Sequence, residues 1–131
     1  MAPGERISVL VVDDDDLLAA AVAALLETED RIEHVGRART GEEAIALVAA
    51  LDPDIVVMDV EMPGIGGLEA THRITTGGGR SGPSVLVVTG ADVEAHWMSA
   101  RAAGAVGYLP KSDLAERLLP TLLAIAESRR R

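Results

Sequence analysis

Hydrophobic residues in this chain gather in short continuous runs, separated by longer segments of helical spacing. Four runs are rich in β-branched residues and bounded by Asp, Gly or Pro: residues 9–12, 55–58, 85–88 and 106–109. Because short continuous runs are typical of strands buried on both faces, we predict strands of a parallel sheet. Residues 31–37, where Ile32 and Val35 stand in a more polar setting, predict a fifth strand at an edge of the sheet.

Segments with apolar residues at helical spacing lie between these runs. We predict five helices, at residues 17–27, 42–51, 67–74, 93–103 and 115–128. Asp92 and Gly104 are expected to cap the fourth helix at its two ends. Pro120 falls inside the last segment, so that helix either begins near Glu116, with Pro120 in its first turn, or is kinked. The glycine-rich stretch 75–82 predicts a loop before the fourth strand.

Strand and helix therefore alternate five times along the chain. We expect an α/β fold with an open, doubly wound sheet of five parallel strands, in the flavodoxin-like order 2-1-3-4-5, and helices on both faces. In such sheets, functional residues gather at the carboxyl ends of the strands, beside the point where the strand order reverses.

Composition narrows the range of functions. The 131 residues include 12 Lys and Arg against 21 Asp and Glu, a net charge of −9, with 48% hydrophobic residues and no cysteine. The length suits one folded domain. The acidic balance argues against a polyanionic partner held by charge alone, and one Trp, one Tyr and no Phe leave no aromatic platform for single-stranded nucleic acid. Without a signal peptide or a run of ~20 apolar residues, the chain is expected to be cytoplasmic, with no membrane partner.

Carboxylates, a hydroxyl and an amine follow the predicted strands. Residues 13–16 are four aspartates after the first strand, Asp59 ends the third, Thr89 the fourth, and Lys111 follows the fifth. Because the carboxyl ends of parallel strands share one edge of a sheet, we expect these side chains to lie together. Clustered carboxylates repel and favour a cation, and oxygen ligands favour a hard ion such as Mg²⁺. Such an ion can hold a phosphoryl group against a carboxylate nucleophile, so we infer formation of an aspartyl phosphate.

Five motifs in order carry a resemblance to a known family. They are VLVVDD at 9–14, PDIVVMDVEMPG at 53–64, GGLEA at 66–70, VLVVTG at 85–90 and AGAVGYLPK at 103–111. Over about residues 6–128, the chain resembles the receiver domain of two-component response regulators. The similarity is greatest to receivers of the nitrate-response, LuxR-type subgroup, which precede a helix-turn-helix output domain.

The resemblance implies roles for the aspartates. Asp59 would be the phosphoacceptor, receiving its phosphoryl group from a sensor histidine kinase. The cofactor would be Mg²⁺, bound by the side chains of Asp14 and Asp59. Asp13 would bind the ion through a water molecule, and Glu61 through its backbone carbonyl.

The same resemblance implies how phosphorylation would change the surface of the domain. Thr89 would be the switch hydroxyl drawn toward the phosphate, and Lys111 would be the counter-ion of the phosphate. Tyr108 would report that movement on the surface of the last helices and strands, where a homodimer is a further expectation. Trp97 is expected to pack half-buried on the fourth helix.

We expect residues 1–128 to form the receiver domain and residues 129–131 to be a basic tail or the start of a linker. The expected output is transcription, through a helix-turn-helix domain outside this chain that alone would contact DNA. A stand-alone signalling receiver is the alternative.

Several positions depart from the family pattern. Asp15 and Asp16 stand where the subgroup commonly has His-Pro, and we expect them to belong to a solvated loop or to a helix start, not to bind the metal. Gly66 replaces a common Asp. Ser112 replaces a proline that many receivers hold in a cis bond; a cis bond before serine costs about 2.5–4 kcal/mol, and the isomer stays open. Glu61 is acidic and is expected to affect the access of water.

Two other function classes fit part of the pattern. A phosphohydrolase with an aspartate nucleophile uses a second Asp two residues further on, where this chain has Glu61, and needs a cap domain that 131 residues do not accommodate. A receiver that switches through protein contacts alone would keep the fold without the phosphorylation. We expect a regulatory domain and not an enzyme, although receivers assist their own phosphorylation and dephosphorylation.

Overall fold

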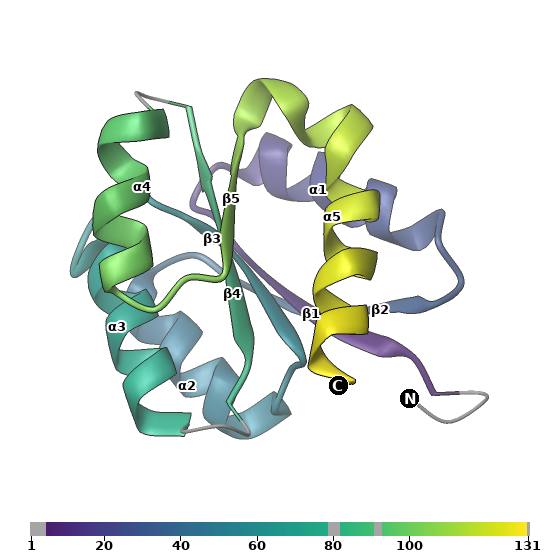
Figure 1. Ribbon diagram of the computed structural model, residues 1–131, viewed down its shortest axis with the longest axis horizontal. Coiled ribbons are helices and arrows are strands. Elements are labelled where there is room, and N and C mark those ends of the chain that lie inside the picture. Colours follow the sequence, from purple (N-terminus) through teal and green to yellow (C-terminus); the bar gives the residue numbers. More distant parts are fainter. Residues whose placement is uncertain (1–4, 79–81, 91–92, 131) are drawn as a thin grey trace.

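The order of elements along the chain follows the predicted alternation of strand and helix (Figure 1). The structure, a computed structural model, describes residues 5–78, 82–90 and 93–130. Its elements are β1 (Ile7–Val12), α1 (Asp16–Glu27), β2 (Ile32–Ala38), α2 (Gly41–Leu51), β3 (Ile55–Asp59), α3 (Gly66–Gly78), β4 (Ser84–Thr89), α4 (Val93–Ala102), β5 (Gly107–Pro110), the short 3₁₀ helix η2 (Lys111–Asp113) and α5 (Leu114–Arg129). No helix within these ranges is both long and apolar enough to cross a lipid bilayer.

The five strands form one parallel sheet in the order β2-β1-β3-β4-β5, which confirms the predicted fold class and strand order. The register keeps the carboxyl ends of the central strands level: Val12 lies opposite Met58, and Asp59 lies opposite Val88. The order reverses at β1 and β3, so the edge where these two strands end is the expected position of a site.

Two hydrophobic cores lie on opposite faces of the sheet. On one face, Val9 and Val11 of β1 pack with buried residues of α1 and α5, among them Leu26 and Leu118. On the other face, Leu10 of β1 packs with buried residues of α2, α3 and α4. Figure 1 shows α1 and α5 on one side of the sheet and the other three helices on the opposite side. Because successive residues of a strand point to opposite faces, both sets must be apolar, which explains the continuous runs.

Helix ends are formed by the residue types that stabilise them. The carboxylate of Asp15 accepts hydrogen bonds from the amides of Leu17 and Leu18 at the start of α1. Gly104, at φ 107°, terminates α4, and its amide donates to the carbonyl of Arg101. The predicted cap at Gly104 is therefore confirmed, while Asp92 lies outside the described residues.

The predicted loop at 75–82 is wrong for its first part, because α3 continues to Gly78. The hydroxyl of Thr75 lies 2.9 Å from the carbonyl oxygen of Thr71 and 2.8 Å from that of Ala103, beyond the end of α4. The contact with Ala103 joins α3 to the residue after α4, and composition alone does not reveal it.

One of the two sequence alternatives placed Pro120 in the first turn of α5, and the structure shows that this is wrong. The helix begins at Leu114 and contains Pro120 in its interior. Leu114 and Leu118 are 5% and 0% exposed, so the buried face of the helix extends back to its first residue. Pro120 itself is exposed, where water can replace the lost backbone bond.

Candidate functional site

Three carboxylates lie together at the carboxyl ends of β1 and β3. Asp13 and Asp14 directly follow β1, and Asp59 is the last residue of β3. One carboxylate oxygen of each lies within 4.8 Å of the other two. Asp13 and Asp59 are only 5% and 2% exposed, whereas Asp14 is exposed. The parallel register thus brings together the three aspartates whose side chains were expected there.

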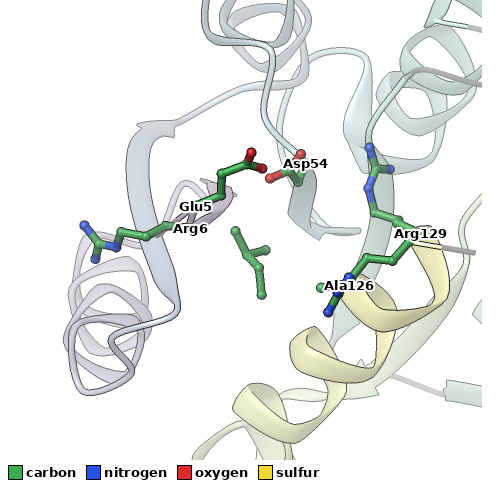
Figure 2. A pocket seen from close by; sticks show the side chains of 7 residues that line it. Glu5, Arg6, Asp54, Ala126 and Arg129 are labelled. Atoms are coloured by element: carbon green, nitrogen blue, oxygen red, sulfur yellow. The ribbon is translucent and has the colours of Figure 1, made fainter. Parts of the chain in front are cut away.

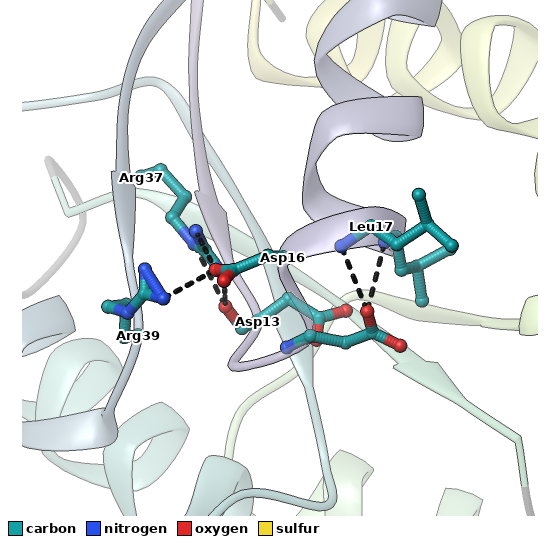
Figure 3. A network of polar contacts seen from close by, with 7 residues as sticks. Asp13, Asp16, Leu17, Arg37 and Arg39 are labelled. Atoms are coloured by element: carbon teal, nitrogen blue, oxygen red, sulfur yellow. Dashed lines mark hydrogen bonds and ion pairs between the residues drawn. The ribbon is translucent and has the colours of Figure 1, made fainter.

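The loop that carries Asp13 and Asp14 is held by hydrogen bonds on several sides (Figure 3). The amide of Asp13 donates to the carbonyl of Ala38 at 3.0 Å, and the amide of Asp15 donates to Oδ1 of Asp13 at 2.8 Å. The Nε and Nη2 groups of Arg37 donate to the backbone carbonyl of Asp13 at 3.0 and 2.7 Å. Asp13, the first residue of this loop, is therefore bound to β2 through both its backbone amide and its backbone carbonyl.

Asp15 and Asp16 do not join the carboxylate cluster. Asp15 caps α1, and Oδ1 of Asp16 accepts from Arg37 at 2.8 Å and also from Arg39. The hydrogen bond from Arg37, together with the charges of Arg39 and Arg37, lowers the pKa of Asp16 against the opposing effect of desolvation. The cap confirms that Asp15 serves the start of α1, whereas the carboxylate of Asp16, the first residue of that helix, forms ion pairs with Arg37 and Arg39.

Asp59 is the carboxylate whose protonation the site alters most clearly. Burial, and then the neighbouring charge of Asp13, raise the pKa of Asp59 to about 6. Two donors oppose this shift: the amide of Glu61, 3.2 Å from Oδ1, and the ammonium of Lys111, 3.4 Å from the same oxygen. The pKa stays raised despite these donors, chiefly because the carboxyl group is buried. Three carboxylates face one ammonium, so the ionised cluster carries more negative than positive charge.

That excess charge fits a hard cation. The ligand atoms are carboxylate oxygens, with no His or Cys among them, which suits Mg²⁺. Within the cluster, Oδ1 of Asp59 is contacted by the amide of Glu61 and by the ammonium of Lys111. A buried carboxylate next to a cation and an ammonium is suited to bind or accept an anionic group such as phosphoryl.

Thr89 and Lys111 lie at the ends of the next two strands. Thr89 is the last residue of β4, is 1% exposed and lies opposite Pro110 of β5. Lys111 directly follows β5 and opens η2. The peptide bond between Lys111 and Ser112 is trans, since the described residues contain no cis bond. The strand ends therefore place the hydroxyl and the amine on the same edge of the sheet as the aspartates.

Tyr108 lies within β5, two residues before its end, and contacts Trp97 of α4. The residue is 37% exposed, and its ring centroid lies 4.9 Å from that of Trp97 on α4, with the planes tilted by 37°. Trp97 is half-buried, as expected from the sequence. The two aromatic residues join α4 to β5 on the surface.

The sequence did not reveal that the segment after β3 requires glycine at position 67. A Cβ atom at Gly67 would lie 2.0 Å from the backbone oxygen of Asp59, so only glycine allows this approach. Gly66, the departure from the family pattern, adopts φ 77°, which also favours glycine. The signal was the pair of adjacent glycines shortly after a strand-end aspartate.

A pocket of about 260 Å³ lies at the amino ends of β1 and β3, away from the carboxylate cluster (Figure 2). Glu5 and Asp54 line one side of it, and Arg129 of α5 lines the other. Asp54 is engaged there by the amide and hydroxyl of Ser8, at 2.9 and 3.1 Å. The lining contains neither the clustered aspartates nor Thr89 or Lys111, so we assign the candidate site to the carboxylate cluster.

Comparison with known proteins agrees with this assignment. The family model described as response regulator receiver domain matches residues 9–122. Response regulator GacA of Pseudomonas viridiflava is 42% identical over 126 residues, which are 94% of this chain and 57% of that protein. The transcriptional regulatory protein DesR of Bacillus subtilis is 32% identical over 95% of this chain and 60% of its own length. The chain thus spans somewhat more than half of these relatives.

A solved structure repeats the fold. The response regulator domain of Thermotoga maritima CheB superposes with a TM-score of 0.84 and 26% identity, covering 92% of this chain and 96% of that one.

Proposed function

This chain belongs to the response regulator receiver domain family, and on that premise we propose that it is a phosphorylation-switched signalling domain whose phosphoacceptor is Asp59. Receiver domains are regulatory and work with sensor histidine kinases. The observation that carries the proposal is the position of Asp59, a buried carboxylate 3.4 Å from the ammonium of Lys111 and clustered with Asp13 and Asp14.

Receiver domains generally bind Mg²⁺ at an acidic pocket, and the donor set of this chain suits that ion. We assign it to the carboxylates of Asp13, Asp14 and Asp59, with Asp13 acting through a water molecule, and to the backbone carbonyl of Glu61. The ion supplies positive charge that offsets the charge developing on the transferred phosphoryl group.

The remaining steps belong to the side chains of this chain. An ionised oxygen of Asp59 attacks phosphorus, and the bond from phosphorus to the histidine nitrogen of the kinase breaks as the new bond to oxygen forms. The amide of Glu61 holds the Asp59 carboxylate in place at 3.2 Å. Lys111 binds one phosphoryl oxygen by its charge, and Thr89 donates its hydroxyl to another. Movement of Thr89 toward the phosphate would then be transmitted to Tyr108.

We further propose that the output is transcription, as in the nitrate-response, LuxR-type subgroup. One relative, DesR, is named as a transcriptional regulatory protein, and this chain matches 60% of its length. In this proposal, residues 1–128 are the receiver, DNA is contacted only by the output domain, and a homodimer forms through the last helices. The cytoplasm is the location that suits these partners.

Phosphorylation is tested by incubating the chain with acetyl phosphate and MgCl₂ and measuring its intact mass. We expect the mass to rise by one phosphoryl group, and to remain unchanged in the Asp59→Asn variant. Asp30→Asn is the matched control, because Asp30 is an exposed aspartate that is not part of the cluster. Phosphorylation that persists in Asp59→Asn would overturn the assignment.

A further inference from the structure

The proposed mechanism does not use Arg37, although this residue touches the loop that carries two of the aspartates. Arg37 lies on β2, and its side chain is 24% exposed. Its guanidinium donates twice to the backbone carbonyl of Asp13 and once to the carboxylate of Asp16 (Figure 3). One planar group therefore joins the end of β1 to the first residue of α1.

These contacts restrain the residue between them. Asp14 lies between Asp13, whose carbonyl Arg37 holds, and the N-cap Asp15, whose amide is bound to Oδ1 of Asp13. The guanidinium is a rigid fork, so its three hydrogen bonds restrain the distance between the Asp13 carbonyl and the Asp16 carboxylate at the start of α1. The direction in which the side chains of Asp13 and Asp14 leave the loop depends on that distance.

We propose that Arg37 is a positioning residue of the cation site, because it holds the β1–α1 loop in the conformation that turns the carboxylates of Asp13 and Asp14 toward Asp59. The inference rests on the proposed function, since the cation belongs to that mechanism. Outer groups that orient metal ligands commonly contribute about 10-fold or more to metal affinity.

Charge alone predicts the opposite effect. A cationic side chain near a site for Mg²⁺ repels the ion, so its removal would strengthen binding if charge were its only contribution. A positioning role predicts weaker binding in Arg37→Met, which keeps a long apolar stem but loses every donor. The sign of the change in affinity therefore separates the two explanations.

Arg39 provides the matched control. It follows β2, carries the same charge and binds the same Asp16 carboxylate, whereas the donors to the Asp13 carbonyl come from Arg37. Arg39→Met should therefore bind Mg²⁺ as the wild type does or slightly more tightly. In Arg37→Met the Asp16 carboxylate keeps Arg39 as a partner, so the substitution acts chiefly on the Asp13 carbonyl, which is left without either guanidinium donor.

The experiment is calorimetric titration of the 131-residue chain with MgCl₂. We expect the dissociation constant to rise about 10-fold in Arg37→Met and to stay close to the wild-type value in Arg39→Met. Arg37→Lys keeps the charge but lacks the fork, so its affinity should fall between the wild type and Arg37→Met. The backbone amide resonances of Asp14 and Asp15 should shift in Arg37→Met before any Mg²⁺ is added, while those of the distant α4 stay in place.

Unchanged or tighter binding in Arg37→Met, or an equal loss in Arg39→Met, would overturn the inference while leaving the proposed function intact. A wild-type chain that binds no Mg²⁺ would overturn the proposed function and the inference with it. If Arg37→Met does not fold, Arg37→Lys decides: affinity equal to the wild type overturns the positioning role, and weaker binding supports it.

Discussion

Asp59 and Asp13 lie at the ends of neighbouring strands, both nearly inaccessible to solvent, with carboxylate oxygens less than 4.8 Å apart. Two buried like charges oppose each other's ionisation, and this repulsion adds to the effect of burial on the pKa of Asp59. Without a cation, ionisation of Asp59 therefore lowers the free energy of unfolding.

Stability without divalent cations should fall as pH rises through about 6. The folded pKa of Asp59, about 6, lies above its usual value of 3.8, so its stabilising contribution is complete below about pH 3.8 and is lost as pH rises through 6. Asp59→Asn cannot ionise and lacks this loss. In urea denaturation with EDTA, Asp59→Asn should thus gain stability relative to the wild type between about pH 4 and pH 6.5, where the unfolded carboxyl group ionises before the folded one. A constant difference between the two proteins over that range would contradict the raised pKa.

Magnesium should stabilise the folded chain at neutral pH. Binding at 100 times the dissociation constant adds about 2.7 kcal/mol to the free energy of unfolding. Asp14→Asn should lose most of this gain, since it removes a carboxylate of the cluster. Asp15→Asn should keep it, because Asp15 caps α1 and asparagine is an equally good cap. Thermal unfolding with and without MgCl₂ measures both variants, and an equal loss in Asp15→Asn would argue against the ligand set.

Gly67→Ala should destabilise the chain by about 3 kcal/mol or more, because the new Cβ would overlap the backbone oxygen of Asp59. Gly77→Ala is the matched control on the same helix. A Cβ at Gly77 meets no atom within 4 Å, so this substitution should stabilise by about 0.5–1 kcal/mol. Urea denaturation of the two variants decides, and a small effect at Gly67 would mean that the turn after β3 adjusts easily.

Phosphorylation should change the fluorescence of Trp97, the single tryptophan of the chain. Its ring contacts that of Tyr108, which we propose to move with the switch hydroxyl of Thr89. Addition of beryllofluoride and MgCl₂ should therefore shift the emission of the wild type and leave that of Asp59→Asn unchanged. An identical response in the two proteins would mean that the emission change does not depend on Asp59, and so that the aromatic pair does not report on the site.

The sequence was informative where burial and topology act directly on residue type. Continuous apolar runs predicted strands buried on both faces, and the strand ends then predicted that Asp13 and Asp59 would meet. Arg37 was not predicted, because its contact with Asp13 joins residues 24 positions apart and follows from the pairing of β1 with β2, which leaves no periodic signal. The length of α3 was missed for a similar reason, since the hydroxyl of Thr75 reaches the distant carbonyl of Ala103.

The central claim is that Asp59 carries the phosphoryl group. Its most direct test is to phosphorylate the chain with acetyl phosphate and MgCl₂, reduce the acyl phosphate with borohydride, and locate the resulting homoserine by peptide mass spectrometry. Our account predicts homoserine at position 59 and at no other aspartate. Homoserine at Asp13 or Asp14, or no modification while Mg²⁺ is bound, would contradict it.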